Sequence, residues 1–275
     1  MSASPSPSSF FRDHLLDWRR PDVRARIAAR LQGTGLVTLD GLERREQAFG
    51  LAQVLMKVTA HRDSDPDGLT AIRDTGPRAT WPGFAGLGSG ELLPHTERSS
   101  VPSPPRLMML ALIRPADSGG TCVLVDGRAV HQDLLADDPE AATTLAEDRA
   151  ALFGGGCGTF APVFENLADN RIRLRLRQDD LVRFHPRVKP HIPALRAAIQ
   201  RHLSHLQLSA GQGYLIDNHR WLHARTAFQG PRLAYRALGE PQFGLALAPG
   251  FRGPEAQRGT PATVVDLLAG GGART

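Results

Sequence analysis

Short apolar runs separated by turn-forming residues dominate the chain between Leu107 and Leu238. Runs of this length that are bounded by Gly, Pro, Asn, Asp or Ser are typical of β-strands. One such boundary is the sequence Asp-Ser-Gly-Gly at residues 117–120, which indicates a turn. The pattern predicts strands at residues 107–113, 122–125, 172–176, 181–184, 213–217 and 233–238.

Helical periodicity lies mainly before these strands and in one later insertion. The predicted helices are residues 22–31, ending at Gly33, then 43–56, 129–135 and 190–206. Residues 36–39, between the first two helices, form another predicted strand. Many short strands with few helices predict a mainly β fold with flanking helices, of the double-stranded β-helix or jelly-roll type.

One domain accounts for this pattern. A chain of 275 residues with 41% hydrophobic content can bury a full core. Residues 1–9 are rich in Ser and Pro, and residues 252–275 are rich in Gly, Ala and Pro, so both are predicted to be disordered or mobile tails. We therefore expect a single domain over residues 10–251.

Cysteine content and hydropathy bear on location. Cys122 and Cys157 are the only cysteines, which gives no disulfide framework. The N-terminus lacks a basic and then apolar signal segment, and no apolar run is long enough to cross a bilayer. We expect a cytoplasmic protein with no membrane association.

The net charge of +5 and the pI near 10 raise the question of nucleic acid. The arginines, however, are scattered, and no segment combines dense basic charge with aromatic residues. The densest cluster, residues 171–177, alternates Arg with apolar residues. That alternation predicts a half-buried strand whose basic face is either solvated, which we favour, or turned to an acidic ligand. Nucleic acid is not an expected partner.

Candidate metal ligands occur in His95-Thr96-Glu97 and at His223. If His95 and Glu97 lie on a strand, the alternation of side chains places both on one face and turns Thr96 away. Two imidazoles and one carboxylate suit non-haem Fe(II) and leave three positions open for a co-substrate and O2. The same three side-chain types also bind catalytic zinc, so a zinc hydrolase is an alternative.

Other residues follow in a fixed order around these candidates. A Gly-Gly pair precedes Thr121, an Asp-Asn pair at residues 217–218 precedes His223, and Arg232 and Arg236 follow it. This ordered set resembles the Fe(II)/2-oxoglutarate dioxygenases of the taurine dioxygenase and clavaminate synthase-like superfamily. The resemblance extends from about residue 37 to residue 238.

The resemblance implies roles for six residues. The implied catalytic and iron-binding residues are His95, Glu97 and His223, and the implied 2-oxoglutarate-binding residues are Thr121, Arg232 and Arg236. An arginine suits the distal carboxylate of 2-oxoglutarate because its guanidinium is planar, permanently charged and able to donate two parallel hydrogen bonds. The short interval after His223 leaves open which arginine meets the co-substrate.

The resemblance also implies an activity. With Fe(II) as the metal and 2-oxoglutarate and O2 as co-substrates, the protein is expected to hydroxylate or desaturate a C–H bond of a small metabolite. Arg236 or Arg225 could hold a substrate carboxylate, which favours an amino acid or a natural-product intermediate. The other hypothesis is a non-catalytic metal- or ligand-binding jelly roll. Substrate identity, regiochemistry, oligomeric state and pathway are left open.

Two loop segments precede residues 95–97, which we call the candidate iron strand. Residues 63–68 are rich in Asp and match the first half of an EF-hand calcium loop, but Gly76 and Pro77 prevent the helix that should follow. Residues 83–90 are rich in Gly. We expect both segments to be loops of an active-site lid.

Overall fold

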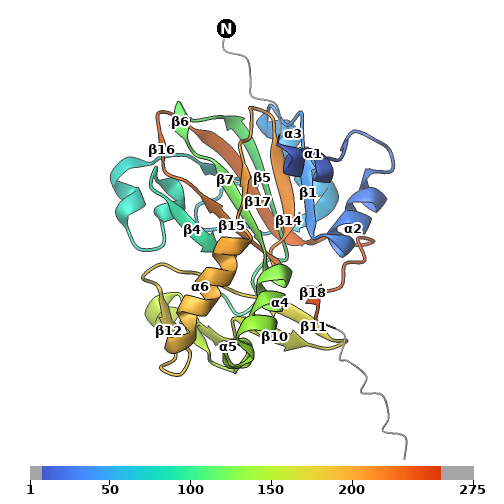
Figure 1. Ribbon diagram of the computed structural model, residues 1–275. Coiled ribbons are helices and arrows are strands. Elements are labelled where there is room, and N and C mark those ends of the chain that lie inside the picture. Colours follow the sequence, from blue (N-terminus) through green and yellow to red (C-terminus); the bar gives the residue numbers. More distant parts are fainter. Residues whose placement is uncertain (1–7, 255–275) are drawn as a thin grey trace, which may run out of the picture.

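The computed structural model describes residues 8–254 (Figure 1). The predicted tails lie almost wholly outside these residues. Helix α1 (Ser9–His14) already begins at Ser9, and strand β18 (Phe251–Arg252) includes Arg252. The ordered elements therefore extend slightly beyond the predicted domain of residues 10–251.

Two antiparallel sheets form the β-rich half of the molecule, which is the upper half in Figure 1. The larger has the order β1 (Leu36–Leu39), β14 (Gly213–Asp217), β5 (Leu107–Arg114), β17 (Leu233–Pro241) and β2 (Met56–Val58), with β3 (Thr70–Ile72) beside β17. The smaller has the order β13 (Ser204–Leu206), β7 (Cys122–Asp126), β15 (Trp221–Arg225) and β4 (Leu92–His95). Neighbouring strands are mostly distant in the sequence.

The inner faces of the two sheets share one apolar core. Met108 and Ile216 of the larger sheet belong to the same buried cluster as Leu124 and Trp221 of the smaller sheet. Side chains alternate along each strand, so the opposite face of β5 contributes Met109 to a different cluster. Strand β5 is thus apolar on both faces because both faces are covered.

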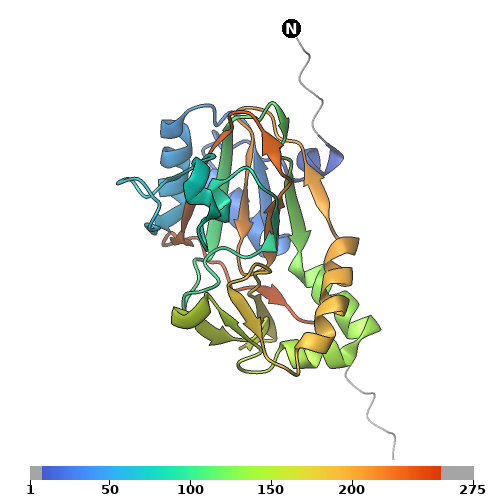
Figure 2. The same cartoon turned by 90° about the vertical axis from the view of Figure 1, so that its left-hand side faces the viewer.

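Helices α2 (Val23–Gly33) and α3 (Arg45–Leu55) cover the outer face of the larger sheet, and Figure 2 shows α3 at its left-hand side. Ile27 of α2 and Leu51 of α3 are buried with Leu215 of β14 in one cluster. Among the helices within residues 8–254, none is both long and apolar enough to cross a bilayer. The fold is mainly β with flanking helices, as the sequence predicts.

The lower half of the molecule is built from a segment that enters after β7 and leaves before β13, joined by β18, which pairs antiparallel with β11 (Arg171–Leu174) (Figure 1). Its helices are α4 (Gly127–Asp137), α5 (Pro139–Leu145) and α6 (Ile192–Arg201), and its strands are β8 (Ala151–Phe153), β9 (Thr159–Ala161), β10 (Phe164–Leu167), β11 (Arg171–Leu174) and β12 (Val182–Phe184). These elements surround a third buried cluster, the core of the lower half, which includes Leu134 and Phe153. The remaining short elements are β6 (Ser118–Gly119), β16 (Phe228–Gln229), η1 (Gly76–Thr80), η2 (Ala85–Leu87), η3 (Gly155–Cys157) and η4 (Lys189–His191).

The predicted helix over residues 190–206 is shorter in the structure. Helix α6 ends at Arg201, and the chain continues as β13, which pairs antiparallel with β7. Leu206 of β13 is buried while His205 is exposed, which is the alternation of an edge strand. Pairing with β7 therefore overrides the helical pattern at this end.

The prediction that the basic face of residues 171–177 is solvated was wrong. Arg173 forms an ion pair with Glu165 at 2.6 Å, and Arg177 forms one with Asp179 at 2.5 Å. Arg175 is only 3% exposed and donates hydrogen bonds to the carbonyl oxygens of residues 99, 101 and 102. This arginine therefore supports the segment that follows the candidate iron strand.

Buried His131 gives a prediction about stability. Its ring packs against Phe164 at a centroid distance of 4.8 Å, and burial lowers the pKa of the imidazole to about 4. The imidazole of the unfolded chain binds a proton below about pH 6.5, whereas the buried imidazole does so only near pH 4. The contribution of His131 to the unfolding free energy should therefore be fully present above pH 6.5 and fall towards pH 4, by about 2 kcal/mol between pH 7.5 and 5. Urea unfolding at both pH values should show the full loss for the wild type and a loss about 2 kcal/mol smaller for His131→Leu, in which other buried histidines, such as His219, still contribute. His205→Leu, at an exposed position, is the control and should keep the full loss, whereas equal losses in His131→Leu and the wild type would contradict the assignment.

Candidate active site

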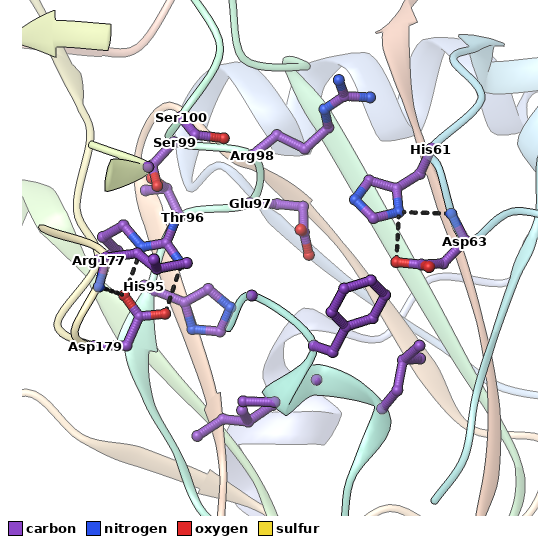
Figure 3. A pocket seen from close by; sticks show the side chains of 18 of the residues that line it. His61, Asp63, His95, Thr96, Glu97, Arg98, Ser99, Ser100, Arg177 and Asp179 are labelled. Atoms are coloured by element: carbon purple, nitrogen blue, oxygen red, sulfur yellow. Dashed lines mark hydrogen bonds and ion pairs between the residues drawn. The ribbon is translucent and has the colours of Figure 1, made fainter. Parts of the chain in front are cut away.

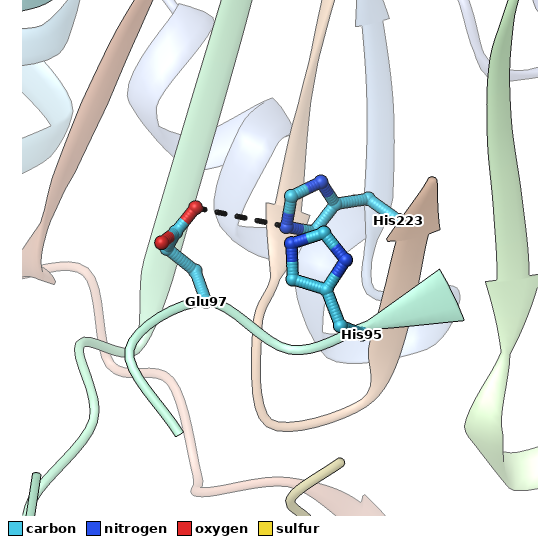
Figure 4. Close-up of side chains that lie close together, drawn as sticks. All are labelled: His95, Glu97 and His223. Carbon is cyan, nitrogen blue, oxygen red and sulfur yellow. Dashed lines mark ion pairs between the residues drawn. The ribbon is translucent and has the colours of Figure 1, made fainter. Parts of the chain in front are cut away.

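Two distant segments of the chain meet at the candidate metal ligands. His95 at the end of β4 and His223 in the middle of β15 are direct cross-strand partners, and their ring centroids lie 4.2 Å apart. Glu97 follows close by, with its Oε2 3.8 Å from Nε2 of His223. One ligand atom from each of the three residues lies within 4.8 Å of the others (Figure 4). This arrangement can hold a single metal ion.

Glu97 does not lie on the strand, contrary to the prediction. Strand β4 ends at His95, and Glu97 stands in the turn that follows. Asn218 positions this turn: its Oδ1 accepts from the backbone N–H of Glu97 at 2.6 Å, and its Nδ2 donates to the carbonyl of Glu97 at 3.1 Å and to that of Pro105 at 2.8 Å. Asn218 is completely buried, so both backbone groups of the carboxylate ligand are held by one side chain.

Thr96 is turned away from the site, as predicted. Its backbone N–H donates to the carbonyl of Leu176 at 2.8 Å, and its hydroxyl accepts from the N–H of Leu176 at 3.1 Å. These two bonds connect the turn to the segment that carries Arg175 and Arg177. The site is therefore anchored to the lower half of the molecule.

All three residues are in the protonation states that a metal requires. Nδ1 of His95 donates to the carbonyl of Leu93 at 2.8 Å, which leaves Nε2 as the free acceptor. Burial lowers the pKa of His95 and, further, that of His223, so both imidazoles are neutral at neutral pH. Burial alone would raise the pKa of Glu97, but the charge of Arg236 opposes it and the pKa is lowered to about 2. The donor set fits a divalent cation.

Arg236 is paired with this carboxylate. It lies on β17, and its Nη1 donates a short hydrogen bond to Oε2 of Glu97. Its Nε is buried without a hydrogen-bond partner. Arg236 also lines the cavity beside the site. The structure therefore places Arg236 next to the metal ligands.

Arg232 lies in a separate buried group. Its Nε and Nη1 are buried without hydrogen-bond partners, and its Nη2 lies 3.9 Å from Sγ of Cys122. Arg225 and Tyr214 complete the group, since Arg225 is the cross-strand partner of Cys122, and Tyr214 is among the neighbours that lower the pKa of the Cys122 thiol against the larger, raising effect of burial. We refer to Cys122, Tyr214, Arg225 and Arg232 as the arginine cluster.

Thr121 does not face this cluster. Its hydroxyl donates to Oε1 of Gln207 at 2.7 Å, and its N–H donates to Oγ1 of Thr226 at 3.0 Å. Thr121 lies just before strand β7, which begins at the buried Cys122, so the two side chains have different partners. The residue of this segment that contacts Arg232 is thus Cys122.

Arg225 is also placed differently from the expectation that it holds a substrate. Its Nη2 donates to the carbonyl oxygens of Gly88 and Gly90, both at 2.6 Å. The sequence offered one signal for this position: Arg225 lies two residues beyond His223, on the same face of the strand. The roles of Asn218, Cys122 and Tyr214 depend on cross-strand contacts that the sequence does not reveal.

A cavity of about 500 Å³ opens beside His95 and Glu97. In Figure 3, Glu97 points into it between His95 on one side and His61 on the other. The two predicted lid segments contribute to its wall through Asp63, Phe84 and Leu87, among other residues. The cavity is of the size that holds a small metabolite.

The acidic residues of the first lid segment have partners other than calcium. Asp65 and Asp67 form ion pairs with Arg45, both at 2.8 Å. Asp63 accepts from Arg78 at 2.8 Å and lies 3.3 Å from Nδ1 of His61. These pairs attach the segment to helix α3 and to η1, which agrees with a lid rather than an EF-hand.

The sequence profile of the taurine catabolism dioxygenase TauD, TfdA family matches residues 5–238. The chain belongs to this family. It is 29% identical over 148 residues to a uridine-5'-phosphate dioxygenase from Streptomyces sp, and the match covers 47% of this chain and 54% of the relative. The chain thus spans about half the length of this curated relative.

Solved structures share the fold. An asparagine oxygenase in complex with Fe(II), 2S,3S-3-hydroxyasparagine and succinate has a TM-score of 0.65 at 15% identity, over 80% of this chain and 79% of that one. The non-heme iron oxygenase OrfP, in complex with Fe, succinate and (3S)-hydroxy-L-Arg, has a TM-score of 0.60 at 17% identity, over 83% of each chain. PvcB from Pseudomonas aeruginosa has a TM-score of 0.62 at 14% identity, over 82% of this chain and 84% of that one.

The contacts of Asn218 predict a loss of metal affinity in Asn218→Ala. Without the amide, the backbone of Glu97 loses two buried hydrogen bonds and the carboxylate is no longer fixed. We expect the Kd for Co(II), measured anaerobically by its absorption spectrum, to rise at least tenfold. Gln212→Ala, which removes a buried side-chain bond to the N–H of Ser209, is the control and should bind Co(II) as the wild type does. An unchanged Kd in Asn218→Ala would contradict the positioning role.

The different partners of Thr121 and Cys122 predict different effects on 2-oxoglutarate. Cys122→Ala removes a side chain that contacts Arg232, so the Kd for 2-oxoglutarate, measured by anaerobic titration with Fe(II), should rise severalfold. Thr121→Val removes only the bond to Gln207 and should leave this Kd within about twofold, because such hydrogen bonds contribute modestly. The reverse result would restore Thr121 as the co-substrate contact.

Proposed function

We propose that this protein is an Fe(II)- and 2-oxoglutarate-dependent oxygenase that hydroxylates, or alternatively desaturates, a C–H bond of a small metabolite. The observation that carries the proposal is the set of His95, Glu97 and His223, which has ligand atoms within 4.8 Å of one another beside a cavity of about 500 Å³. Family membership and the fold of the structural neighbours support it. The two facing sheets then correspond to the two halves of a double-stranded β-helix.

The metal would be held by Nε2 of His95, Nε2 of His223 and a carboxylate oxygen of Glu97. Bound Fe(II) supplies an oxidation by O2 in which 2-oxoglutarate becomes succinate and CO2 and, in hydroxylation, the substrate C–H becomes C–OH. Structural neighbours solved with Fe and succinate, and with Fe and alpha-ketoglutaric acid, support this cofactor set. The carbonyl of Leu93 and the side chain of Asn218 keep the ligands oriented.

Arg232 is the residue we assign to the distal carboxylate of 2-oxoglutarate. Its two unpartnered buried nitrogens are donors that an anion would satisfy. Arg236 already has a carboxylate partner in Glu97, which argues against it as the main co-substrate contact. Cys122 takes the place beside Arg232 that the sequence assigned to Thr121.

Arg236 is assigned to two tasks. It keeps Glu97 ionised, because its guanidinium is the largest of the influences that lower the pKa of this carboxyl group. It also faces the cavity, where it can meet an anionic group of the substrate. The curated relative is named for a nucleoside phosphate, and two structural neighbours contain hydroxylated amino acids. A phosphate and an amino-acid carboxylate are both suited to a guanidinium, so we propose an anionic small molecule as the substrate.

A zinc hydrolase and a non-catalytic binding protein are the alternatives. Both would use the three metal ligands, but neither needs the buried arginine cluster. Two buried guanidiniums with unpartnered donors are costly unless an anion joins them. This cluster therefore favours the co-substrate-dependent oxygenase.

The test is 2-oxoglutarate decarboxylation. Wild-type protein should release succinate from 2-oxoglutarate with Fe(II) and O2, slowly without substrate and faster with a suitable anionic metabolite, and Zn(II) should not replace Fe(II). Glu97→Ala should abolish succinate release while its far-UV circular dichroism spectrum stays native, because the metal loses its carboxylate ligand. Glu91→Ala, at an exposed residue of the same cavity wall, is the matched control. Absence of Fe(II)-dependent succinate formation by the wild type would reject the proposed function.

A further inference from the structure

Arg225 occupies a particular place relative to the metal ligands. On β15 it lies two residues beyond His223, so both side chains point to the inner side of the smaller sheet. On the neighbouring β7, His223 pairs with Leu124 and Arg225 pairs with Cys122. Arg225 therefore occupies the next position after His223 on the same face of β15.

Arg225 and Arg232 form a pair of buried like charges. They are 5% and 4% exposed, and their guanidinium carbons lie 4.7 and 5.7 Å from the centre of the same Phe228 ring. Burial, followed by the charge of Arg232, lowers the pKa of Arg225 to about 10. Nε of Arg225 is buried without a hydrogen-bond partner, as are Nε and Nη1 of Arg232. Two buried guanidiniums that both lie beside the Phe228 ring and have unpartnered donors are suited to one anionic group.

The remaining donors of Arg225 hold a loop. Its Nη2 donates to the carbonyls of Gly88 and Gly90, and the N–H of Phe228 donates to the carbonyl of Ser89 at 2.9 Å. The residues just before this point, including Phe84 and Leu87, form part of the cavity wall. Arg225 thus connects the arginine cluster with the loop that encloses the substrate cavity.

We propose that Arg225 is a second guanidinium for the distal carboxylate of 2-oxoglutarate, and that through its bonds to Gly88 and Gly90 it couples binding of the co-substrate to ordering of the cavity wall at residues 83–90. The inference rests on the proposed function. A bound carboxylate satisfies the free Nε of Arg225 and offsets the repulsion from Arg232. The guanidinium is then fixed, and the loop carbonyls that it holds are fixed with it.

Two measurements test the coupling on the protein loaded anaerobically with Fe(II). The first is the Kd for 2-oxoglutarate, followed by the visible charge-transfer absorption that develops as the keto acid binds. The second is hydrogen–deuterium exchange of the peptide covering residues 83–90, with and without 2-oxoglutarate. Wild type, Arg225→Lys and Arg62→Lys are compared. Arg62 is the matched control because its Nη2 donates to the carbonyl of Gly83, at the other end of the same loop.

The expected result for the wild type is slower exchange at residues 83–90 when 2-oxoglutarate is present. Arg225→Lys keeps the charge but cannot donate to the carboxylate and to two carbonyls together, so its Kd should rise about tenfold and the effect on exchange should disappear. Arg62→Lys should exchange faster at this loop yet bind 2-oxoglutarate within about twofold of the wild type.

Several outcomes would overturn the inference. In the wild type, exchange at residues 83–90 that does not respond to 2-oxoglutarate rejects the coupling, whether or not Arg225→Lys folds. A wild-type Kd in Arg225→Lys rejects the direct contact, and an equal rise in Arg62→Lys shows that the arginine acts only through loop stability. A wild type that binds no 2-oxoglutarate with Fe(II) rejects the proposed function itself, which separates the two failures.

Discussion

The pairing of β4, β15 and β7 is the constraint on which the site depends. His223 lies opposite His95 on one side and opposite Leu124 on the other. A shift of one residue would turn His223 to the other face of the sheet. Apolar neighbours fix this register, because Trp221 belongs to the core between the sheets and Leu222 belongs to the core of the lower half. The metal ligands are therefore aligned by the burial of residues that do not touch a metal.

Around this alignment, arginines stabilise irregular backbone. Arg175 donates to three carbonyls just after the candidate iron turn, and Arg225 donates to two just before the iron strand. A guanidinium can satisfy several carbonyl groups in one plane, which an ammonium group does less well. Lysine is nearly absent from the chain, with Lys57 and Lys189 the only two. In buried positions, the preference for arginine thus has a structural use beyond the overall composition.

Local patterns in the sequence predicted much of the fold. Strands β1 and β14 have the predicted limits, because both are short apolar runs between clear turn residues. Helix α6 was predicted too long, since partner strand β7 decides where the helix gives way to β13. The arginines of residues 171–177 were assigned to solvent because alternation alone does not show which side of a strand another segment covers.

The sequence predicted which residues could form the candidate site better than it predicted the contacts that these residues make. The spacing of His95, Glu97 and His223 identified a group of residues that the structure brings together. Thr121 was chosen where Cys122 faces Arg232, because the sequence does not fix the phase of alternation at the start of a strand. Glu97 was placed on the strand because the amide that bends the chain there, Asn218, is far away in sequence.

The residues that line the cavity are concentrated in one part of the sequence. Most of it comes from residues 61–101, and the rest comes from Gly154, four residues between 177 and 181, and Arg236. The other residues that we assign to the metal and the co-substrate, such as His223 and Arg232, come from later parts of the chain. Exchange of this stretch of gene between relatives that both carry His95 and Glu97 would therefore replace most of the cavity wall and still retain all three candidate metal ligands, so that new substrate specificities could arise in few steps.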